Sequence, residues 1–338
     1  MNDDLPRVPG PVLIADIGGT NARFALAGDT DDGIVRFPDE QGASFPTIDD
    51  AIARALDRSG ARPRSAVLAL AGPIRGDAVA LTNSPWVVEP KRLIKRFGFE
   101  EVILLNDFEA LSLSLADLAP GDLDFIGQGS AEPMRPRVVL GPGTGLGAAA
   151  LIHARGIWIP VPGEGGHVDL APVTERDFAI WPHIEKPGPG SISGETLLCG
   201  SGLVRLYRAV AATSGVKATL ATPPDIAKAG LDGSDATARE TLDLFAAYLG
   251  RVAGDLALVF VATGGVYLAG GITGHIAPAL KTGHFRDAFI DKFPHGPLLE
   301  RIGTAIITKP DAALAGIAAF ARNPDRFGVE AGGRLWRA

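Results

Sequence analysis

An amide and a carboxylate, Asn106 and Asp107, directly follow the apolar run 102–105. The run predicts a buried strand, and ligands of open α/β sheets bind outside the carboxyl ends of strands. A carboxylate placed there could accept a proton from an attacking hydroxyl, which is the role of the base in phosphoryl transfer. Asp107 could instead be the N-cap of the helix that follows, so the residues alone leave both roles open.

Glycine-rich segments end three further apolar runs, and each could bind phosphate. Glycine allows backbone amides to approach an anion closely, and threonine adds a hydroxyl donor. Glycine also makes ordinary hairpin turns, and none of the segments has the Gly-Lys-Ser/Thr sequence of a Walker loop or a full dinucleotide fingerprint. The residues concerned are Gly18, Gly19 and Thr20, then Gly141, Gly143, Thr144 and Gly145, and finally Gly270 and Gly271.

Asp16 stands just before the first of these glycine turns. A carboxylate in that place could hold a hydrated Mg²⁺ beside phosphate oxygens. The alternative is an aspartate that caps its own turn. The residue types and their order therefore favour a site for a nucleotide and its metal, without excluding a structural role.

A loop with few bulky side chains, "PVPGEGGHVDLAP", carries Glu164 and His167. Carboxylate and imidazole groups suit the hydroxyls of a sugar, and three glycines would let the two side chains converge on a small ligand. A surface loop with an incidental histidine is the alternative. Glu195 opens a helical pattern and could simply favour the helix dipole, and Asn83 could be a turn residue near Pro85.

The elements that must position these residues alternate between strands and helices. The patterns predict strands over 12–16, 23–27, 65–70 and 78–82, and a helix that begins after Thr47 and stops at Gly60. A short buried strand runs into a helix at the Asn106–Asp107 junction. Further helices are expected over 234–260 and 311–322, with a strand before Gly270. This mixture predicts an α/β layer architecture.

Composition limits the classes of protein that fit. The chain has 338 residues, of which 46% are hydrophobic and 21% charged, so it can form two domains or one large one. A net charge of −7 argues against nucleic acid or an anionic membrane as partner. The apolar stretch 256–272 is broken by Gly264 and Gly265 and has 17 residues, short of the ~20 that span a bilayer. The single cysteine, Cys199, and an acidic N-terminus favour a reducing cytoplasm.

Six motifs in order give the chain a family resemblance. They are "DIGGTNARFAL", "LAGPIRGDAVALTNSPWVV", "LLNDFEALSLSL", "LGPGTGLGAAAL", "PVPGEGGHVDLAP" and "LAGGI". Over about 13–320 the chain resembles the bacterial ATP-dependent glucokinases, within the superfamily of actin-like ATPases and sugar kinases. Ala15 stands where a glycine is common in that family. The cysteine-rich zinc motif of the related ROK-type kinases is absent from the sequence, which favours the zinc-free branch.

The resemblance implies a fold, an activity and an organisation. The fold would be the two-domain α/β actin-like ATPase (ribonuclease H-like) sugar kinase fold with an interdomain cleft. The small domain would cover 1–117 and receive a C-terminal helix at about 310–323, and the large domain would cover 118–309. Apart from the resemblance, the terminal residues 324–338 are expected to form a loosely ordered tail. The activity would be transfer of the ATP γ-phosphoryl group to the 6-hydroxyl of glucose, the first step of glycolysis, in a cytoplasmic homodimer.

The resemblance also implies roles for individual residues. Asp107 matches the catalytic base, and Asp16 would bind Mg²⁺ through water. The glycine turns together with Asp16 match the ATP-binding segments. The positions that match glucose contacts are Asn83, Asn106, Asp107, Glu164, His167 and Glu195.

The sequence leaves other functions open. Within sugar kinases, mannose, fructose or an N-acetylhexosamine could be the substrate instead of glucose. A non-catalytic sugar sensor would need a DNA-binding segment, for which the residues before Asp16 leave no room. An ATPase or exopolyphosphatase of the same superfamily would lack a cluster of sugar-facing polar groups.

Overall fold

The computed structural model describes residues 8–19, 21–28, 33–81 and 84–338. Two of the predicted site residues, Thr20 and Asn83, lie outside the described residues. The chain divides into two compact units. The first comprises Met1–Leu118, Leu151–Pro162 and Lys309–Ala338, and the second comprises Ala119–Ala150 and Gly163–Thr308.

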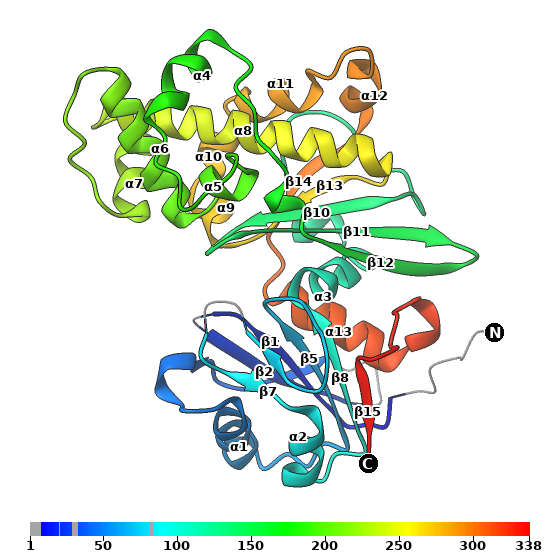
Figure 1. The fold of residues 1–338 in the computed structure, drawn as a ribbon. Coiled ribbons are helices and arrows are strands. Elements are labelled where there is room, and N and C mark those ends of the chain that lie inside the picture. The colour runs from blue at the N-terminus through cyan, green and yellow to red at the C-terminus, as the bar shows by residue number, and fades with distance from the viewer. Residues whose placement is uncertain (1–7, 20, 29–32, 82–83) are drawn as a thin grey trace. The chain divides into compact units, whose positions relative to one another are not determined.

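The first unit is built on a mixed sheet in the order β15-β8-β5-β1-β2-β3, with β4 paired to β2 (Figure 1). The three central strands, β1, β5 and β8, run parallel, so their carboxyl ends lie at one edge. They are apolar almost throughout because helices cover both faces of the sheet. The strands are β1 (Val12–Ile17), β2 (Asn21–Ala27), β3 (Ile34–Arg36), β4 (Glu40–Gln41), β5 (Ser65–Leu70), β8 (Glu101–Asn106) and β15 (Leu335–Arg337).

Two pairs of helices cover this sheet. Helices α1 (Ile48–Ser59) and α2 (Pro90–Phe97) pack on one face, and α3 (Asp107–Ser114) and α13 (Ala312–Arg322) pack together on the other (Figure 1). The predicted limits of α1 are confirmed, because the Thr47 side chain accepts a hydrogen bond from the backbone N of Asp50 and Gly60 ends the helix at φ 67°. Helix α13 approaches α3 closely at Gly316.

A second sheet has the order β12-β11-β10-β13-β14-β9, and residues Leu151–Pro162 of its β11–β12 hairpin are grouped with the first unit. Strands β10, β13 and β14 are parallel, and β9 joins the edge antiparallel to β14. The strand predicted before Gly270 is β13, and it is fully buried. The strands are β9 (Leu123–Phe125), β10 (Arg137–Pro142), β11 (Leu146–Ala154), β12 (Ile157–Gly163), β13 (Val266–Leu268) and β14 (Thr304–Ile307).

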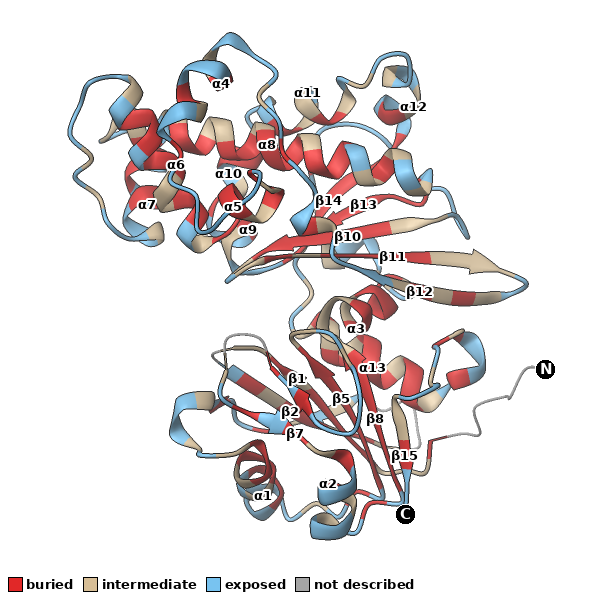
Figure 2. Cartoon of the chain, viewed as in Figure 1, coloured by how far each residue is buried: buried red, intermediate tan, exposed pale blue. Residues whose placement is uncertain are grey.

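The apolar spacing over 234–260 predicts a long helix with one buried side, and helix α8 (Ala236–Phe260) confirms it (Figure 2). Its buried face includes Phe245 and Leu249, and at Gly250 helix α11 comes so close that a Cβ would lie 2.2 Å from the Phe285 carbonyl oxygen. The other helices are α4 (Glu175–Ile180), α5 (Gly194–Leu197), α6 (Gly200–Thr213), α7 (Pro223–Asp232), α9 (Gly271–His275), α10 (Ala277–Leu280), α11 (His284–Ile290) and α12 (Gly296–Arg301).

Short elements complete the chain. The strand expected over 78–82 is the two-residue β6 (Val79–Ala80), which pairs with β7 (Val87–Val88) in a separate two-stranded sheet. The 3₁₀ turns are η1 (Gly42–Ser44), η2 (Pro120–Asp122), η3 (Gly165–His167), η4 (Trp181–His183) and η5 (Pro324–Arg326). Within the described part of the chain, every helix is too short or too polar to cross a bilayer.

The C-terminal residues differ from the expected tail at 324–338. They form η5 and then strand β15, which pairs antiparallel with β8 through Leu335 opposite Ile103 and Trp336 opposite Val102. The indole of buried Trp336 donates a hydrogen bond to Asp77. A three-residue strand carries no detectable alternation, and its place is decided by the open edge of β8, whose backbone groups it satisfies.

Candidate active site

The junction between β8 and α3 places Asn106 and Asp107 at the carboxyl edge of the first sheet. Asn106 is the N-cap of α3, and its side-chain oxygen accepts hydrogen bonds from the backbone N of Phe108 at 3.0 Å and of Glu109 at 3.2 Å. Its amide group donates to the Gly72 carbonyl at 3.4 Å. Because the N-cap is Asn106, the alternative that Asp107 is the N-cap is wrong.

Asp107 is the first residue of α3 and is half-buried. Its Oδ1 accepts a hydrogen bond from the backbone N of Phe108 at 2.9 Å. The N-terminus of a helix carries a partial positive charge, which stabilises a carboxylate in its ionised form. An ionised carboxylate held at the edge of a parallel sheet can accept a proton.

Asp16 lies at the same edge of the first sheet as the Asn106–Asp107 junction, because Asp16 pairs in register with Ala69 of β5, and Ala69 with Leu105 of β8. Its Oδ2 accepts a hydrogen bond from Arg23 Nη1 at 3.0 Å. Burial raises the pKa of the Asp16 carboxyl above its ordinary value, and the Arg23 guanidinium opposes that rise.

The first glycine turn connects β1 to β2. It is closed by a hydrogen bond from the backbone N of Gly18 to the carbonyl of Asn21 at 3.0 Å. Gly19 lies within this turn. The turn follows Asp16 directly, so a carboxylate and backbone amides come from one short segment, as the motif indicates.

The second and third glycine turns come together in the second unit. In the second turn, the backbone N of Gly143 donates to the carbonyl of Gly145 at 2.8 Å, and the backbone N of Gly200 donates to Gly143 at 2.9 Å. The third turn packs against it, because a Cβ on Gly270 would lie 2.5 Å from the Pro142 carbonyl oxygen, and Gly270 has φ 90°. Only glycine fits that approach and that conformation.

The remaining members of these two turns differ in their surroundings. Gly141 is buried within β10, and Thr144 is exposed at the tip of the second turn. A Cβ on Gly143 would have no atom within 4 Å, and the same holds for Gly271, the first residue of α9. The side on which a Cβ would project is open at Gly143 and at Gly271, so a ligand can approach the two residues from that side.

Three predicted sugar-binding side chains converge beside the second glycine turn. His167 Nε2 lies 3.9 Å from Glu164 Oε2 and 3.8 Å from Glu195 Oε1. Glu195 is anchored, because its Oε2 accepts a hydrogen bond from the backbone N of Leu146 at 2.7 Å. Two carboxylates and one imidazole within reach of one another can bind several hydroxyls of a small polar ligand.

Glu195 also explains one glycine of the turn. A Cβ on Gly145 would lie 2.3 Å from Glu195 Oε2. The carboxylate that faces His167 therefore rests on the backbone of the segment predicted to bind phosphate. In the second unit, the Glu195 side chain therefore connects the candidate sugar-binding residues with the candidate nucleotide-binding turn.

Three residues that support this site were not anticipated from the sequence. Arg23 forms an ion pair with Asp16, and Arg334 forms one with Glu109. Each arginine comes from a different strand or loop than its partner, and no local sequence pattern identifies either arginine. Glu109 does carry a signal, because an asparagine followed three residues later by a glutamate before an apolar run is the sequence of a capping box.

Comparison with known proteins gives a consistent result. The sequence model described as Glucokinase matches residues 13–324. A glucokinase of Rhizobium etli is 52% identical over 337 residues, which cover 99% of this chain and 98% of that protein.

Solved structures agree with these sequence relatives. The crystal structure of a glucokinase from an Antarctic psychrotroph superimposes with a TM-score of 0.81 at 33% identity, covering 92% of this chain and 98% of the other. A ROK family glucokinase from Streptomyces griseus has a TM-score of 0.63 at 21% identity, covering 93% of this chain and all of the other, a likeness in fold.

Proposed function

The chain belongs to the glucokinase family, and we propose that Asp107 is the base of the reaction that this family performs. The chain phosphorylates glucose at the 6-hydroxyl with ATP, giving glucose 6-phosphate and ADP. Its fold is the two-domain α/β actin-like ATPase fold of sugar kinases. The observation that carries the assignment of Asp107 is its place as first residue of α3, at the carboxyl edge of three parallel strands.

In the proposed step, Asp107 accepts the proton of the 6-hydroxyl while that oxygen attacks the γ-phosphorus in line with the departing ADP. The O–H bond breaks, a phosphorus–oxygen bond to the sugar forms, and the bond to the β-phosphate oxygen breaks. Little covalent help is needed in phosphoryl transfer, so the chain accelerates the step chiefly by positioning and electrostatics.

Glucose hydroxyls are bound, in this proposal, by Asn106, Glu164, His167, Glu195 and Asn83. The convergence of Glu164 and Glu195 on His167 supports a shared ligand for the three side chains. Carboxylates accept hydrogen bonds from sugar hydroxyls, and the imidazole can donate or accept.

The phosphates of ATP are bound by the backbone amides of the glycine turns. The supporting observation is the open space above Gly143 and Gly271, together with the close packing of Gly270 on Pro142. Amides held rigidly in such turns stabilise the negative charge that spreads over the transferring phosphoryl group.

Asp16 fits the metal that accompanies ATP in kinases. Mg²⁺ keeps most of its waters and takes one or two carboxylates plus substrate phosphates, so a single carboxylate beside a phosphate-binding turn suffices. The bound metal would neutralise phosphate charge, and Arg23 would hold the Asp16 carboxylate in place.

The test of the base is Asp107→Asn, which keeps the shape of the side chain and removes its basicity. We expect kcat to fall about 10²-fold or more, the lower part of the range for general bases. Glucose binding, followed by calorimetry without nucleotide, should persist. Near-normal turnover would reject Asp107 as the base.

The test of the substrate is a coupled assay of ADP release over glucose, mannose, fructose and N-acetylhexosamines. We expect the highest kcat/KM with glucose and little ADP release without sugar. A higher kcat/KM with another hexose would show that this hexose is the preferred substrate. ATP hydrolysis without sugar would favour an ATPase.

We also propose the organisation that the family resemblance implies. Residues 1–117 with the helix at 310–323 would act as the small domain and 118–309 as the large domain, in a cytoplasmic homodimer. Light scattering on the purified chain tests the dimer, since a monomer mass across micromolar concentrations would contradict it.

A further inference from the structure

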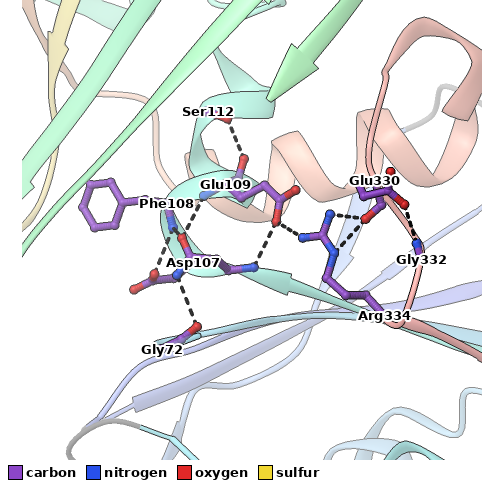
Figure 3. Close-up of polar contacts among 9 residues, drawn as sticks. Gly72, Asp107, Phe108, Glu109, Ser112, Glu330, Gly332 and Arg334 are labelled. Atoms are coloured by element: carbon purple, nitrogen blue, oxygen red, sulfur yellow. Dashed lines mark hydrogen bonds and ion pairs between the residues drawn. The ribbon is translucent and has the colours of Figure 1, made fainter. Parts of the chain in front are cut away.

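A buried ion pair connects the C-terminal segment to the helix that begins with Asp107. Arg334 Nη1 lies 2.6 Å from Glu109 Oε2, and the two side chains are 15% and 1% exposed (Figure 3). The partners are 225 residues apart in the chain. Removing a carboxylate from water is costly unless a cation and hydrogen bonds compensate it, so Glu109 depends on Arg334.

The same carboxylate oxygen holds the backbone in front of Asp107. Glu109 Oε2 also accepts a hydrogen bond from the backbone N of Asn106 at 3.2 Å. In return, the Asn106 side chain accepts from the backbone N of Glu109. This reciprocal pair determines where β8 ends and α3 begins, and therefore the direction in which Asp107 leaves the sheet edge.

Arg334 is itself held on both sides. Its carbonyl accepts a hydrogen bond from the backbone N of Leu104 at 3.0 Å, and its Nε donates to the Glu330 carbonyl at 2.7 Å. Its Nη2 donates to the same Glu330 carbonyl, and Glu330 Oε1 accepts from the backbone N of Gly332 (Figure 3). The loop 330–334 therefore presents the guanidinium to Glu109 in a defined geometry.

We propose that Arg334 is a positioning residue for catalysis, which acts through Glu109 on the Asn106–Asp107 junction. The inference rests on the proposed role of Asp107 as base. Without Arg334, the Glu109 carboxylate is left buried and uncompensated, so it turns toward solvent. That movement weakens its bond to the Asn106 backbone and loosens the first turn of α3.

Strand β15 offers a matched control for a merely structural role. Arg337 lies in β15, three residues after Arg334, and pairs with a glutamate of β8, with 3.3 Å between its Nε and Glu101 Oε2. Glu101 lies at the opposite end of β8 from Asn106. Removing the Arg337 guanidinium therefore breaks a more exposed arginine–glutamate contact of the same C-terminal segment without touching the Asn106–Asp107 junction.

The experiment compares Arg334→Gln with Arg337→Gln at a temperature well below both melting transitions. We expect Arg334→Gln to lower kcat and raise KM for glucose, with a combined loss in kcat/KM of about tenfold or more, since a displacement near 1 Å can cost about 10²-fold. KM for ATP should stay within about twofold of wild type. Arg337→Gln should leave all three constants within about twofold.

Two further variants separate positioning from folding. The double variant Arg334→Gln with Glu109→Gln should lose no more activity than the less active single variant, because both substitutions remove the same contact. Glu109→Leu with Arg334→Met replaces the buried pair by apolar groups that often preserve stability. That double variant should keep its melting temperature and still lose about tenfold in kcat/KM for glucose.

Several results would overturn the proposal. One is equal kinetics for Arg334→Gln and Arg337→Gln. Another is a fall in kcat alone, in proportion to the unfolded fraction. Additive losses of activity in Arg334→Gln with Glu109→Gln would also overturn it. So would full activity in Glu109→Leu with Arg334→Met. Failure of the base assignment is distinguishable, because it shows as near-normal turnover in Asp107→Asn.

Discussion

Replacing Gly145 by alanine tests whether the second glycine turn and the glucose site share a side chain. The new Cβ would lie 2.3 Å from Glu195 Oε2 and 3.1 Å from its Cδ. Gly145 has no left-handed φ, so alanine brings no backbone strain. The clash falls on the end of a flexible side chain, and the carboxylate is therefore the group that moves.

The size of the effect follows from that movement. An ordinary contact needs about 3.4 Å or more, so the carboxylate retreats by about 1 Å and leaves the backbone N of Leu146, which now holds it at 2.7 Å. Glucose then loses the hydrogen bond that Glu195 is proposed to make. A hydrogen bond to a charged group contributes about 1.5–3 kcal/mol. Glucose affinity should therefore fall about 10-fold to 100-fold.

The assay is calorimetric titration of glucose without nucleotide, which separates sugar binding from phosphate binding. Gly143→Ala is the matched control, because its Cβ would meet no atom within 4 Å. That variant should bind glucose within about twofold of wild type while its KM for ATP rises, since its new methyl group faces the open space above the turn. Gly145→Ala with Glu195→Asp should recover part of the glucose affinity, because the shorter side chain withdraws from the methyl group.

An unchanged glucose affinity in folded Gly145→Ala would refute this reasoning. So would an equal loss of glucose affinity in Gly143→Ala, because the loss would then come from the turn as a whole and not from Glu195.

Three further results are expected. Glu164→Gln should raise KM for glucose with kcat less affected, and an unchanged KM would remove Glu164 from the sugar contacts. Asp16→Asn should raise the Mg²⁺ concentration for half-maximal rate about tenfold, and an unaltered Mg²⁺ titration would contradict the metal role. Burial raises the pKa of Asp177, but backbone amides and Arg251 outweigh it and hold that pKa below its ordinary value. The ionised Asp177 carboxylate therefore stabilises the folded state above about pH 4, and this stabilisation is lost as the pH falls through the folded-state pKa. Asp177→Asn should accordingly lower the midpoint of urea unfolding more at pH 6 than at pH 3.

Local sequence patterns determine much of the fold. Thr47 and Gly60 mark the two ends of α1, and the apolar spacing that ends at Phe260 predicts α8. Both signals are local, because helix caps and helical periodicity depend on neighbours in the chain. The apolar run before Asn106 likewise placed the candidate base at the end of a buried strand. Glu164 and His167 are three residues apart in the chain, so their proximity could also be predicted from the sequence.

Only the tertiary structure decided which distant segments meet at these positions. Glu195 reaches Gly145, and Arg334 reaches Glu109 across 225 residues. Strand β15 has three residues and no readable alternation, so its pairing depends on the free edge that β8 offers. The physical reason is that strand order and the packing of turns minimise exposed apolar surface and unpaired backbone groups over the whole unit, and no short segment carries that information.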